Sequence, residues 1–201
     1  MLRKIHNDGH AMAEHSIHSD PSQRRSAAER FLADVEQRAL RMALIATRQR
    51  DEALDIVQDT MLAWVKRYLN RPQQEWKPLF YKVLQNSIRD WHRRSGVRRR
   101  LMTWLGRGDG DGDGHHDALT AVADPNAPDP VGVLDHRQTL ERLLHAVQRL
   151  PLRQQQAFLL RSWEGLDVSA TALAMGCSEG SVKTHLSRAM ASLRAAVEDE
   201  L

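Results

Sequence analysis

The sequence predicts an all-α protein made of two small helical domains joined by a flexible acidic linker. Apolar residues recur at helical spacing over residues 27–106 and again over residues 133–201. The stretch between them, residues 107–132, is rich in Gly, Asp and Pro, a composition that cannot pack a core. A chain of 201 residues suits this division, because each domain can bury a modest core of its own.

Residues 1–26 are polar, and we expect them to form a disordered tail. They include four histidines at irregular spacing, but nothing nearby could hold these as metal ligands, so disorder is favoured over a metal site. The tail lacks the apolar core of a signal peptide, and no apolar run in the chain approaches the length of a membrane span. The single cysteine, Cys177, excludes an internal disulfide. We therefore expect a cytoplasmic protein without membrane contact.

The first domain begins with two predicted helices. Ser26 and Glu29 form a capping box, which predicts that the first helix starts there and ends near Thr47, before a break at Arg50 and Asp51. The second helix ends before Pro72. Its apolar residues recur at helical spacing and are Leu54, Val57, Met61, Leu62, Val65 and Leu69. Its other side is polar and bears Asp55, Gln58 and Asp59.

The third helix, starting near Trp76 or Pro78, ends in a basic segment. From Trp76 to Gly108 there are nine Lys and Arg residues against a single acidic residue, Asp90. Aromatic residues such as Trp91 are interleaved with these bases, a pattern that suits both phosphate neutralisation and stacking on unpaired bases. The alternative is a solvated helix end that complements the macrodipole, but that accounts for two or three arginines, not for six. The segment therefore favours nucleic-acid binding.

The linker and the histidines offer weaker alternatives, a calcium site and a metal hydrolase. Alternating aspartates from Asp109 to Asp113 resemble a calcium-binding loop, but Thr120 stands where the twelfth ligand should be glutamate. The histidines outside the tail that could serve a hydrolase straddle the linker and a helix, with no supporting carboxylates; they are His115, His116, His136 and His145. We therefore expect no metal, no cofactor and no enzymatic activity.

The second domain ends in a helix-turn-helix pattern. A helix through Leu134 and Val147 comes first, and Pro151 opens another at its favoured first position, which Gly165 ends. Asp167 then caps a short helix that closes at Gly176. Ser178 caps the last helix, whose apolar stripe is Val182, Leu186, Ala189, Leu193 and Val197.

The opposite face of this last helix is small and polar, with Gly180, Ser181, Thr184, Ser187 and Arg188, and with Lys183 at its edge. Such side chains can lie in a major groove of DNA without a steric or charge clash. An ordinary α-hairpin in a helical bundle would show a similar pattern. The basic helix upstream favours the DNA-binding interpretation.

Three motifs in this order resemble a bacterial RNA polymerase sigma factor of the extracytoplasmic-function group of the sigma-70 family. DEALDIVQDTMLAW (51–64) is similar to the family's region 2.2, and WKPLFYKVLQNSIRDWHRR (76–94) is similar to regions 2.3 and 2.4. The long segment 150–194 resembles region 4 almost throughout. The resemblance implies a region 2 domain, a linker and a region 4 domain, and covers the chain from about Glu29 to Val197.

The resemblance also implies a role for each matching residue. Asp55, Gln58 and Asp59 would face the clamp helices of the polymerase β′ subunit, with the β subunit as a further partner. In region 2 the residues that would meet the promoter −10 element are Asn86, Arg89, Arg93 and Arg94. In region 4 the residues that would meet the −35 element are Lys183, Thr184, Ser187 and Arg188. An anti-sigma factor is a further candidate partner.

Two hypotheses stand beside this one. The chain could be a transcriptional regulator that binds operator DNA through the helix-turn-helix and never touches core polymerase, although such a regulator has no need of the polar cassette at Asp55 and Asp59. Independently, the acidic linker could fold onto the basic segment from Arg89 to Arg100 in the free protein. A solvated spacer is the alternative reading of the linker, and the one we prefer.

Overall fold

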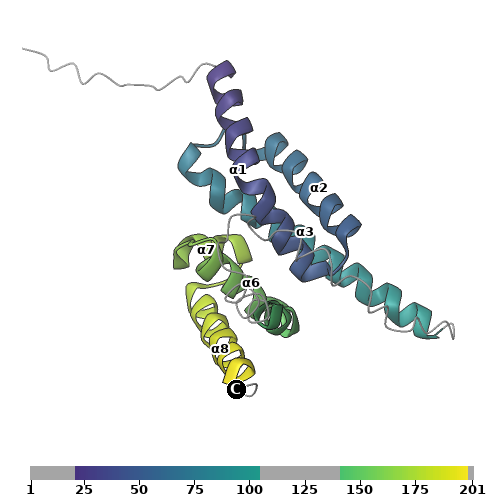
Figure 1. Cartoon of the computed structure of the whole chain (residues 1–201). Coiled ribbons are helices and arrows are strands. Elements are labelled where there is room, and N and C mark those ends of the chain that lie inside the picture. The colour runs from purple at the N-terminus through teal and green to yellow at the C-terminus, as the bar shows by residue number, and fades with distance from the viewer. Residues whose placement is uncertain (1–20, 105–140, 199–201) are drawn as a thin grey trace, which may run out of the picture.

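The computed structural model describes residues 21–104 and 141–198, and within these ranges every regular element is a helix (Figure 1). The N-terminal half contains α1 (Pro21–Thr47), α2 (Arg50–Tyr68) and α3 (Gln73–Trp104). In the C-terminal half, residues 141–149 are helical, followed by α6 (Leu152–Phe158), the π-helix η1 (Leu159–Trp163), α7 (Val168–Met175) and α8 (Glu179–Glu198). The all-α fold class is confirmed. None of the described helices is long and apolar enough to cross a membrane.

Helix α1 starts earlier than the capping box suggested. It begins at Pro21, a residue favoured in the first turn because its missing N–H would have no helical partner there. Ser26 therefore lies inside the helix, and the prediction that it is the N-cap was wrong. The break before α2 also comes earlier, at Arg48, whose φ of 58° reverses the chain. Thr47 supports this turn, because its Oγ1 donates to the carbonyls of Ala43 and Gln49 at 2.9 and 3.0 Å.

Four aromatic rings join α1, α2 and α3. The Phe31 ring lies 5.0 Å from that of Trp64, 5.7 Å from that of Trp76 and 5.9 Å from that of Phe80, measured between centroids. Trp64 and Trp76 meet edge to face at 5.3 Å, and the Trp76 indole N–H donates to the carbonyl of Arg71 at 2.8 Å. Such rings bury large apolar areas in favourable geometry. This cluster fixes how the three helices of the N-terminal half pack.

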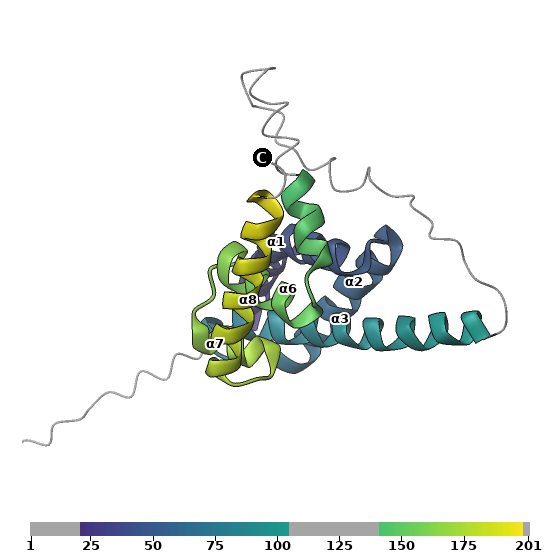
Figure 2. The same ribbon diagram turned by 90° about the horizontal axis from the view of Figure 1, so that it is seen from below.

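Helix α3 is longer than predicted. It begins at Gln73 and passes through Pro78, although proline lacks an N–H donor and disfavours an interior helical position. The buried side chains of Trp76 and Phe80 on either side of Pro78 hold this first part against α1 and α2. The C-terminal part of α3 extends beyond the other helices (Figure 2).

The caps predicted for the helix-turn-helix are confirmed. The Asp167 carboxylate accepts from the N–H of Ala170 at 2.6 Å and starts α7. Gly176, with φ 63° and ψ 48°, ends α7 in the left-handed conformation. The Ser178 hydroxyl then accepts from the N–H of Ser181 at 3.2 Å and starts α8. Pro151 is the N-cap residue of α6 rather than its first helical residue, a shift of one position.

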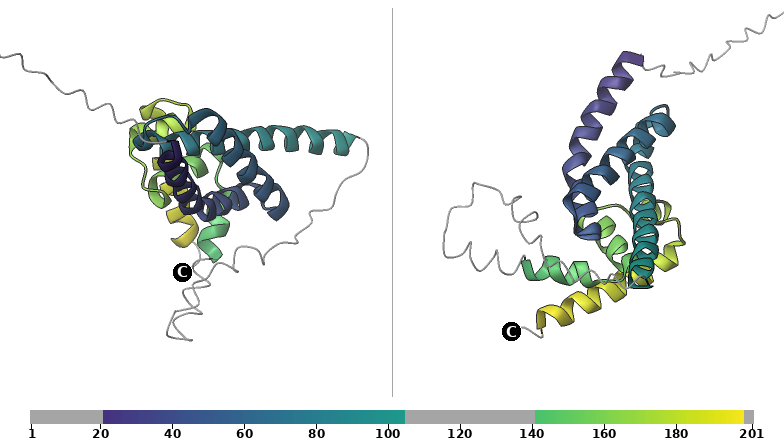
Figure 3. Two further views of the ribbon diagram at one scale, coloured as in Figure 1. Left: turned by 90° about the horizontal axis from the view of Figure 1, so that it is seen from above. Right: turned by 90° about the vertical axis from the view of Figure 1, so that its right-hand side faces the viewer.

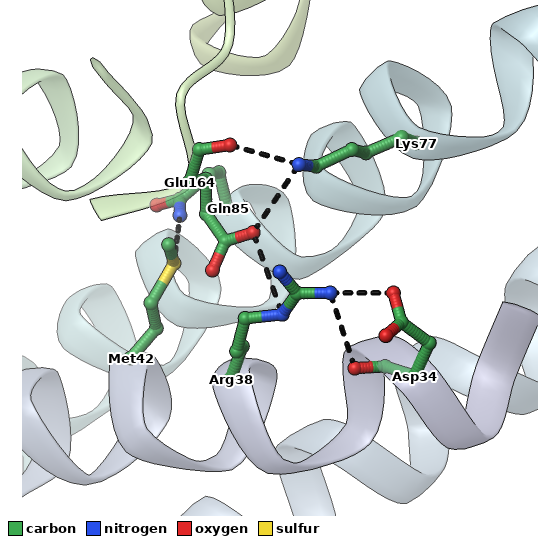
Figure 4. A network of polar contacts seen from close by, with 6 residues as sticks. All are labelled: Asp34, Arg38, Met42, Lys77, Gln85 and Glu164. Carbon is green, nitrogen blue, oxygen red and sulfur yellow. Dashed lines mark hydrogen bonds and ion pairs between the residues drawn. The ribbon is translucent and has the colours of Figure 1, made fainter. Parts of the chain in front are cut away.

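The two halves pack against each other. Helix α7 lies on α3, and buried residues from both halves form one hydrophobic cluster (Figures 1 and 3). The buried Glu164 side chain, from the connection between η1 and α7, lies with its Oε2 3.9 Å from Arg38 Nε on α1 and 3.7 Å from Lys77 Nζ on α3 (Figure 4). The sequence predicted two domains, each with its own core, and did not predict this contact. The expected linker at residues 107–132 and most of the polar tail lie outside the described residues.

Candidate polymerase and nucleic-acid interfaces

The outer face of α2 carries Asp55, Gln58 and Asp59, and all three are exposed. Ile56 and Val57 on the other side of the same helix are buried. A helix alternates between faces every three to four residues, so this burial directs the three polar side chains to solvent. The three residues therefore share an outward face of α2, as the sequence predicted.

Three residues of the apolar pattern predicted for α2 are exposed. Leu54, Leu62 and Val65 are 43%, 53% and 38% exposed, and they flank the polar residues at intervals of eight and three along the helix. The apolar pattern of α2 is therefore wider than the face that its neighbouring helices cover. An apolar strip mixed with carboxylates is typical of a protein-binding surface. The sequence analysis did not include these residues in the candidate site. A signal was present, because α2 has more apolar residues than one buried stripe of a helix can hold.

The −10 candidates lie together on α3. Asn86, Arg93 and Arg94 are exposed, whereas Arg89 is half-buried. The Arg89 guanidinium donates to the Asn86 side-chain oxygen and, at 3.2 Å, to the carbonyl of Met175 at the end of α7. Arg93 pairs with Asp90 at 3.3 Å on the surface. The four residues share one region of α3, but Arg89 is engaged by the C-terminal half.

The environment of Arg89 is unfavourable for its positive charge. Burial lowers the pKa of its guanidinium, and the nearby cation Arg153 lowers it further. Arg153 donates to the same Met175 carbonyl at 2.7 Å. Two guanidinium groups therefore converge on the negative end of α7, whose dipole offsets part of their mutual repulsion.

Trp91 does not offer a stacking surface for an unpaired base. It is 8% exposed, and its indole N–H donates to the Glu52 carboxylate on α2 at 2.8 Å. The expectation drawn from the interleaved aromatics was wrong for this residue, because its ring is needed to pack α3 on α2. An open groove remains nearby between α2 and α3, lined by Ile56, Asp59, Ser87, Asp90, Arg93 and Arg94.

Helix α8 presents the −35 candidates to solvent. Lys183, Thr184, Ser187 and Arg188 are all exposed. The predicted apolar stripe is largely confirmed, because Val182, Ala189 and Leu193 are buried and Leu186 is half-buried; the side chain of Val197 lies outside those described. The stripe fixes the rotation of α8, and the four polar residues consequently lie on its free face.

Comparison with known proteins identifies the C-terminal half directly. Residues 140–193 match the family described as sigma-70, region 4. The RNA polymerase sigma factor NccH of Alcaligenes xylosoxydans xylosoxydans is 27% identical over 145 residues, which is 72% of this chain and 72% of that protein. Residues 140–193 therefore form a sigma-70 region 4 domain, and the chain as a whole is similar to sigma factors of the extracytoplasmic-function group. It is a sigma factor of transcription initiation.

Further similarities agree with this assignment. The RNA polymerase sigma-E factor of Streptomyces antibioticus is 41% identical to the sigma factor over 56 residues, 28% of this chain and 31% of that protein. The fold is similar to sigma factor RpoE of Bartonella quintana, solved with the anti-sigma factor NepR, with a TM-score of 0.62 and 24% identity over 86% of this chain and 98% of that chain. It is also similar to CnrH, solved with the cytosolic domain of CnrY, with a TM-score of 0.55 and 18% identity over 88% and 91% of the two chains.

Within the described ranges of the sigma factor, no group of three or more His, Cys, Asp or Glu side chains could hold a metal ion. The tail histidines, His115, His116, His136 and the aspartates from Asp109 to Asp113 lie outside those ranges. Cys177 is half-buried and packs against the shared core.

Proposed function

We propose that this sigma factor binds core RNA polymerase and directs promoter-specific initiation through three surfaces. Helix α8 recognises the −35 element, α3 recognises and melts the −10 element, and the outer face of α2 binds the polymerase. We assign residues 27–106 to region 2, residues 107–132 to the linker and residues 133–201 to region 4. The observation that carries the proposal is the exposed polar face of α8 on a segment that matches region 4.

On α8, the exposed face offers both charge and hydrogen-bonding groups to a major groove. Lys183 and Arg188 can pair with phosphates or guanine edges, while Thr184 and Ser187 are small enough to let the helix approach the bases. The Thr184 hydroxyl donates to the carbonyl of Gly180 at 3.0 Å, which leaves its methyl group and oxygen lone pairs for contact with DNA.

On α3, Arg93 and Arg94 are placed to neutralise phosphates, while Asn86 offers an amide to a base edge. Extruding a base costs a few kcal/mol, so a protein that traps the extruded base can drive local melting by binding alone. Local melting of the duplex therefore requires no catalytic residue.

On α2, the carboxylates of Asp55 and Asp59 and the exposed Leu62 provide a mixed acidic and apolar face for the β′ clamp helices. The β subunit is the further polymerase partner that we propose. The two structural neighbours were solved with anti-sigma factor NepR and with CnrY, and we propose an anti-sigma factor as a regulatory partner here as well.

Reconstitution tests the proposal. The purified sigma factor is added to core RNA polymerase, and specific transcripts are measured from the DNA upstream of its own gene. We expect initiation at a defined start site with the wild type. Absence of any polymerase binding, combined with specific binding of that DNA by the free protein, would instead support an operator-binding regulator.

Variants then separate the surfaces. Asp55→Asn with Asp59→Asn should weaken polymerase binding roughly tenfold or more, the effect of removing an interface hot spot. Arg188→Ala should weaken promoter binding by about 1–3 kcal/mol without changing polymerase affinity. Glu29→Gln with Glu36→Gln, at two exposed positions on α1, is the control matched to the double variant for two lost negative charges. Unchanged polymerase affinity of the double α2 variant would contradict the assignment of that surface.

A further inference from the structure

The first turn of α8 carries an exposed carboxylate. Glu179 is the first residue of this helix, and the only other acidic residue of α8 is Glu198 at its far end. Lys183 and Arg188, on the same helix, are the cations that we assign to DNA. Phosphates repel a carboxylate, so Glu179 weakens the attraction of α8 for DNA in general. Its presence beside the DNA-facing residues therefore needs a physical reason.

The start of α8 is held without the Glu179 carboxylate. The Ser178 hydroxyl caps the helix by accepting from the N–H of Ser181 at 3.2 Å, and the N–H of Val182 donates to the Ser178 carbonyl at 3.1 Å. A capping box would require the carboxylate at Ser181, two positions further on. Among the ion pairs of the described ranges none involves Glu179, although Lys183 lies one helical turn away. Inside the chain, only the positive end of the helix dipole favours this carboxylate.

Gly180, the next residue, also has no role in the internal packing of the described residues. Apart from its chain neighbours, a Cβ at this exposed position would meet nothing closer than the Ser178 hydroxyl, 3.9 Å away. Glycine is less favourable than alanine in a helix, so this position lowers helix stability without a gain in packing. The missing side chain instead allows a surface outside the molecule to approach the first turn closely.

The major groove of DNA offers a partner for a carboxylate at this position. In helix-turn-helix proteins the N-terminal residues of the second helix contact base edges. Cytosine presents an N4 amino donor there, whereas guanine and thymine present acceptors, and adenine combines its donor with the N7 acceptor. A carboxylate only accepts hydrogen bonds, so cytosine is the base that suits Glu179 best.

Lys183 complements this contact. Residues four positions apart on a helix lie about 5–6 Å from each other between Cβ atoms, and base pairs stack about 3.4 Å apart. Glu179 and Lys183 can therefore reach one base pair or two neighbouring pairs. The Lys183 ammonium is a donor for the O6 and N7 acceptors of guanine. Together the two side chains match the donor and acceptor pattern of a G·C pair.

We propose that Glu179 is a specificity-determining residue of α8, which selects a cytosine in duplex DNA by accepting from its N4 amino group, and that Gly180 lets the first turn approach closely enough for this contact. The inference rests on the proposed function of α8. Glu179 also weakens binding to duplexes that lack this cytosine, because the carboxylate then faces acceptors or phosphates without a donor.

The base preference is tested by selection from duplex DNA with a randomised segment, using the full chain and, separately, the full chain bound to core RNA polymerase. At one position the wild type should enrich C over each other base by at least about fivefold. Glu179→Gln should shift this preference to A, because a glutamine amide pairs with adenine N6 and N7, and Glu179→Ala should abolish it. Glu36→Gln, which removes one negative charge from α1, should select the wild-type sequences.

A purely structural role of Glu179 gives a different result. If the carboxylate served only the helix dipole, Glu179→Gln would weaken binding to every sequence alike and leave the base preferences unchanged. Identical base preferences of the wild type, Glu179→Gln and Glu179→Ala overturn the proposal. If the full chain selects the cytosine but its complex with polymerase gives no transcript, the proposed function fails while the role of Glu179 stands. If the wild type enriches no sequence in either form, both fail.

Gly180→Ala tests the close approach. The variant should bind the selected duplex at least about threefold more weakly, while its thermal stability stays equal or rises, because alanine is the better helix former. The selected duplex bound by this variant as tightly as by the wild type contradicts the role that we assign to Gly180.

Discussion

At the scale of single residues, Tyr81 reports on the buried environment that surrounds Glu164. Its side chain is fully buried on α3. Burial raises the pKa of its phenol far above the ordinary value of 10.0, and the neighbouring Glu164 carboxylate raises it further. The folded protein therefore favours the protonated form of this phenol.

This shift predicts a loss of stability in alkali. Because the folded-state pKa is raised, the stabilising contribution of protonated Tyr81 is fully present below pH 10 and declines as pH rises above it, since only the unfolded chain ionises there. Phenolate absorbance that depends on Tyr81 should appear together with the loss of helical circular dichroism. Tyr81→Phe assigns the signal. A Tyr81 phenolate in the native protein near pH 10 would contradict the prediction.

The candidate DNA-binding residues differ in how far their exposure follows from the local sequence. Lys183, Thr184, Ser187 and Arg188 could be recognised in the sequence because the apolar stripe of one helix dictates which side chains remain outside. Arg89 differs, because its exposure depends on α7, which follows it by about eighty positions in the chain. No sequence pattern around Arg89 predicts its contact with α7.

At the scale of elements, the aromatic cluster holds α2 against α1 and α3. Trp64 is fully buried there and contacts Phe31 and Trp76. Trp64→Ala should destabilise the protein by about 3–5 kcal/mol, through lost transfer energy and the cavity left behind. Guanidinium denaturation followed by circular dichroism measures this difference.

Trp163 provides the matched control for that prediction. It lies at the end of η1 and is 38% exposed. Trp163→Ala should cost much less than Trp64→Ala, because the removed ring is partly hydrated in the folded protein. A similar loss of unfolding free energy in both variants would show that the aromatic cluster contributes no more to stability than a half-buried tryptophan does.

Helix boundaries illustrate a further difference between elements. Asp167, Gly176 and Ser178 act through neighbours within four residues, so their capping roles follow from the sequence. The start of α1 at Pro21 and the passage of α3 through Pro78 do not, because tertiary packing outweighs the local preferences that suggested other limits.

At the scale of the whole molecule, the shared core predicts joint unfolding of the two halves. Leu160 and Ala174 of the C-terminal half and Phe80 and Leu84 of the N-terminal half belong to one buried cluster. Opening it exposes apolar surface in both halves, so their stabilities are coupled. Native-state hydrogen exchange with rising denaturant should remove protection from α1–α3 and α7–α8 together.

Weakening the contact should uncouple the halves. In Glu164→Gln, α7 and α8 should lose protection at a lower denaturant concentration than α1–α3, whereas Glu36→Gln should behave as the wild type. Separate transitions in the wild-type protein would show that the interface adds little to the stability of either half.

Local sequence patterns were enough to predict the all-α class, the caps of the helix-turn-helix, the outward polar faces of α2 and α8 and the family resemblance. These follow from interactions between residues a few positions apart, whose geometry a helix fixes. The packing of the helices, in contrast, leaves Leu62 exposed, buries Trp91 and brings Glu164 to Arg38 and Lys77 between the halves. Burial depends on which surfaces meet, and residues distant in the chain meet through the summed packing of both halves, which no local pattern encodes.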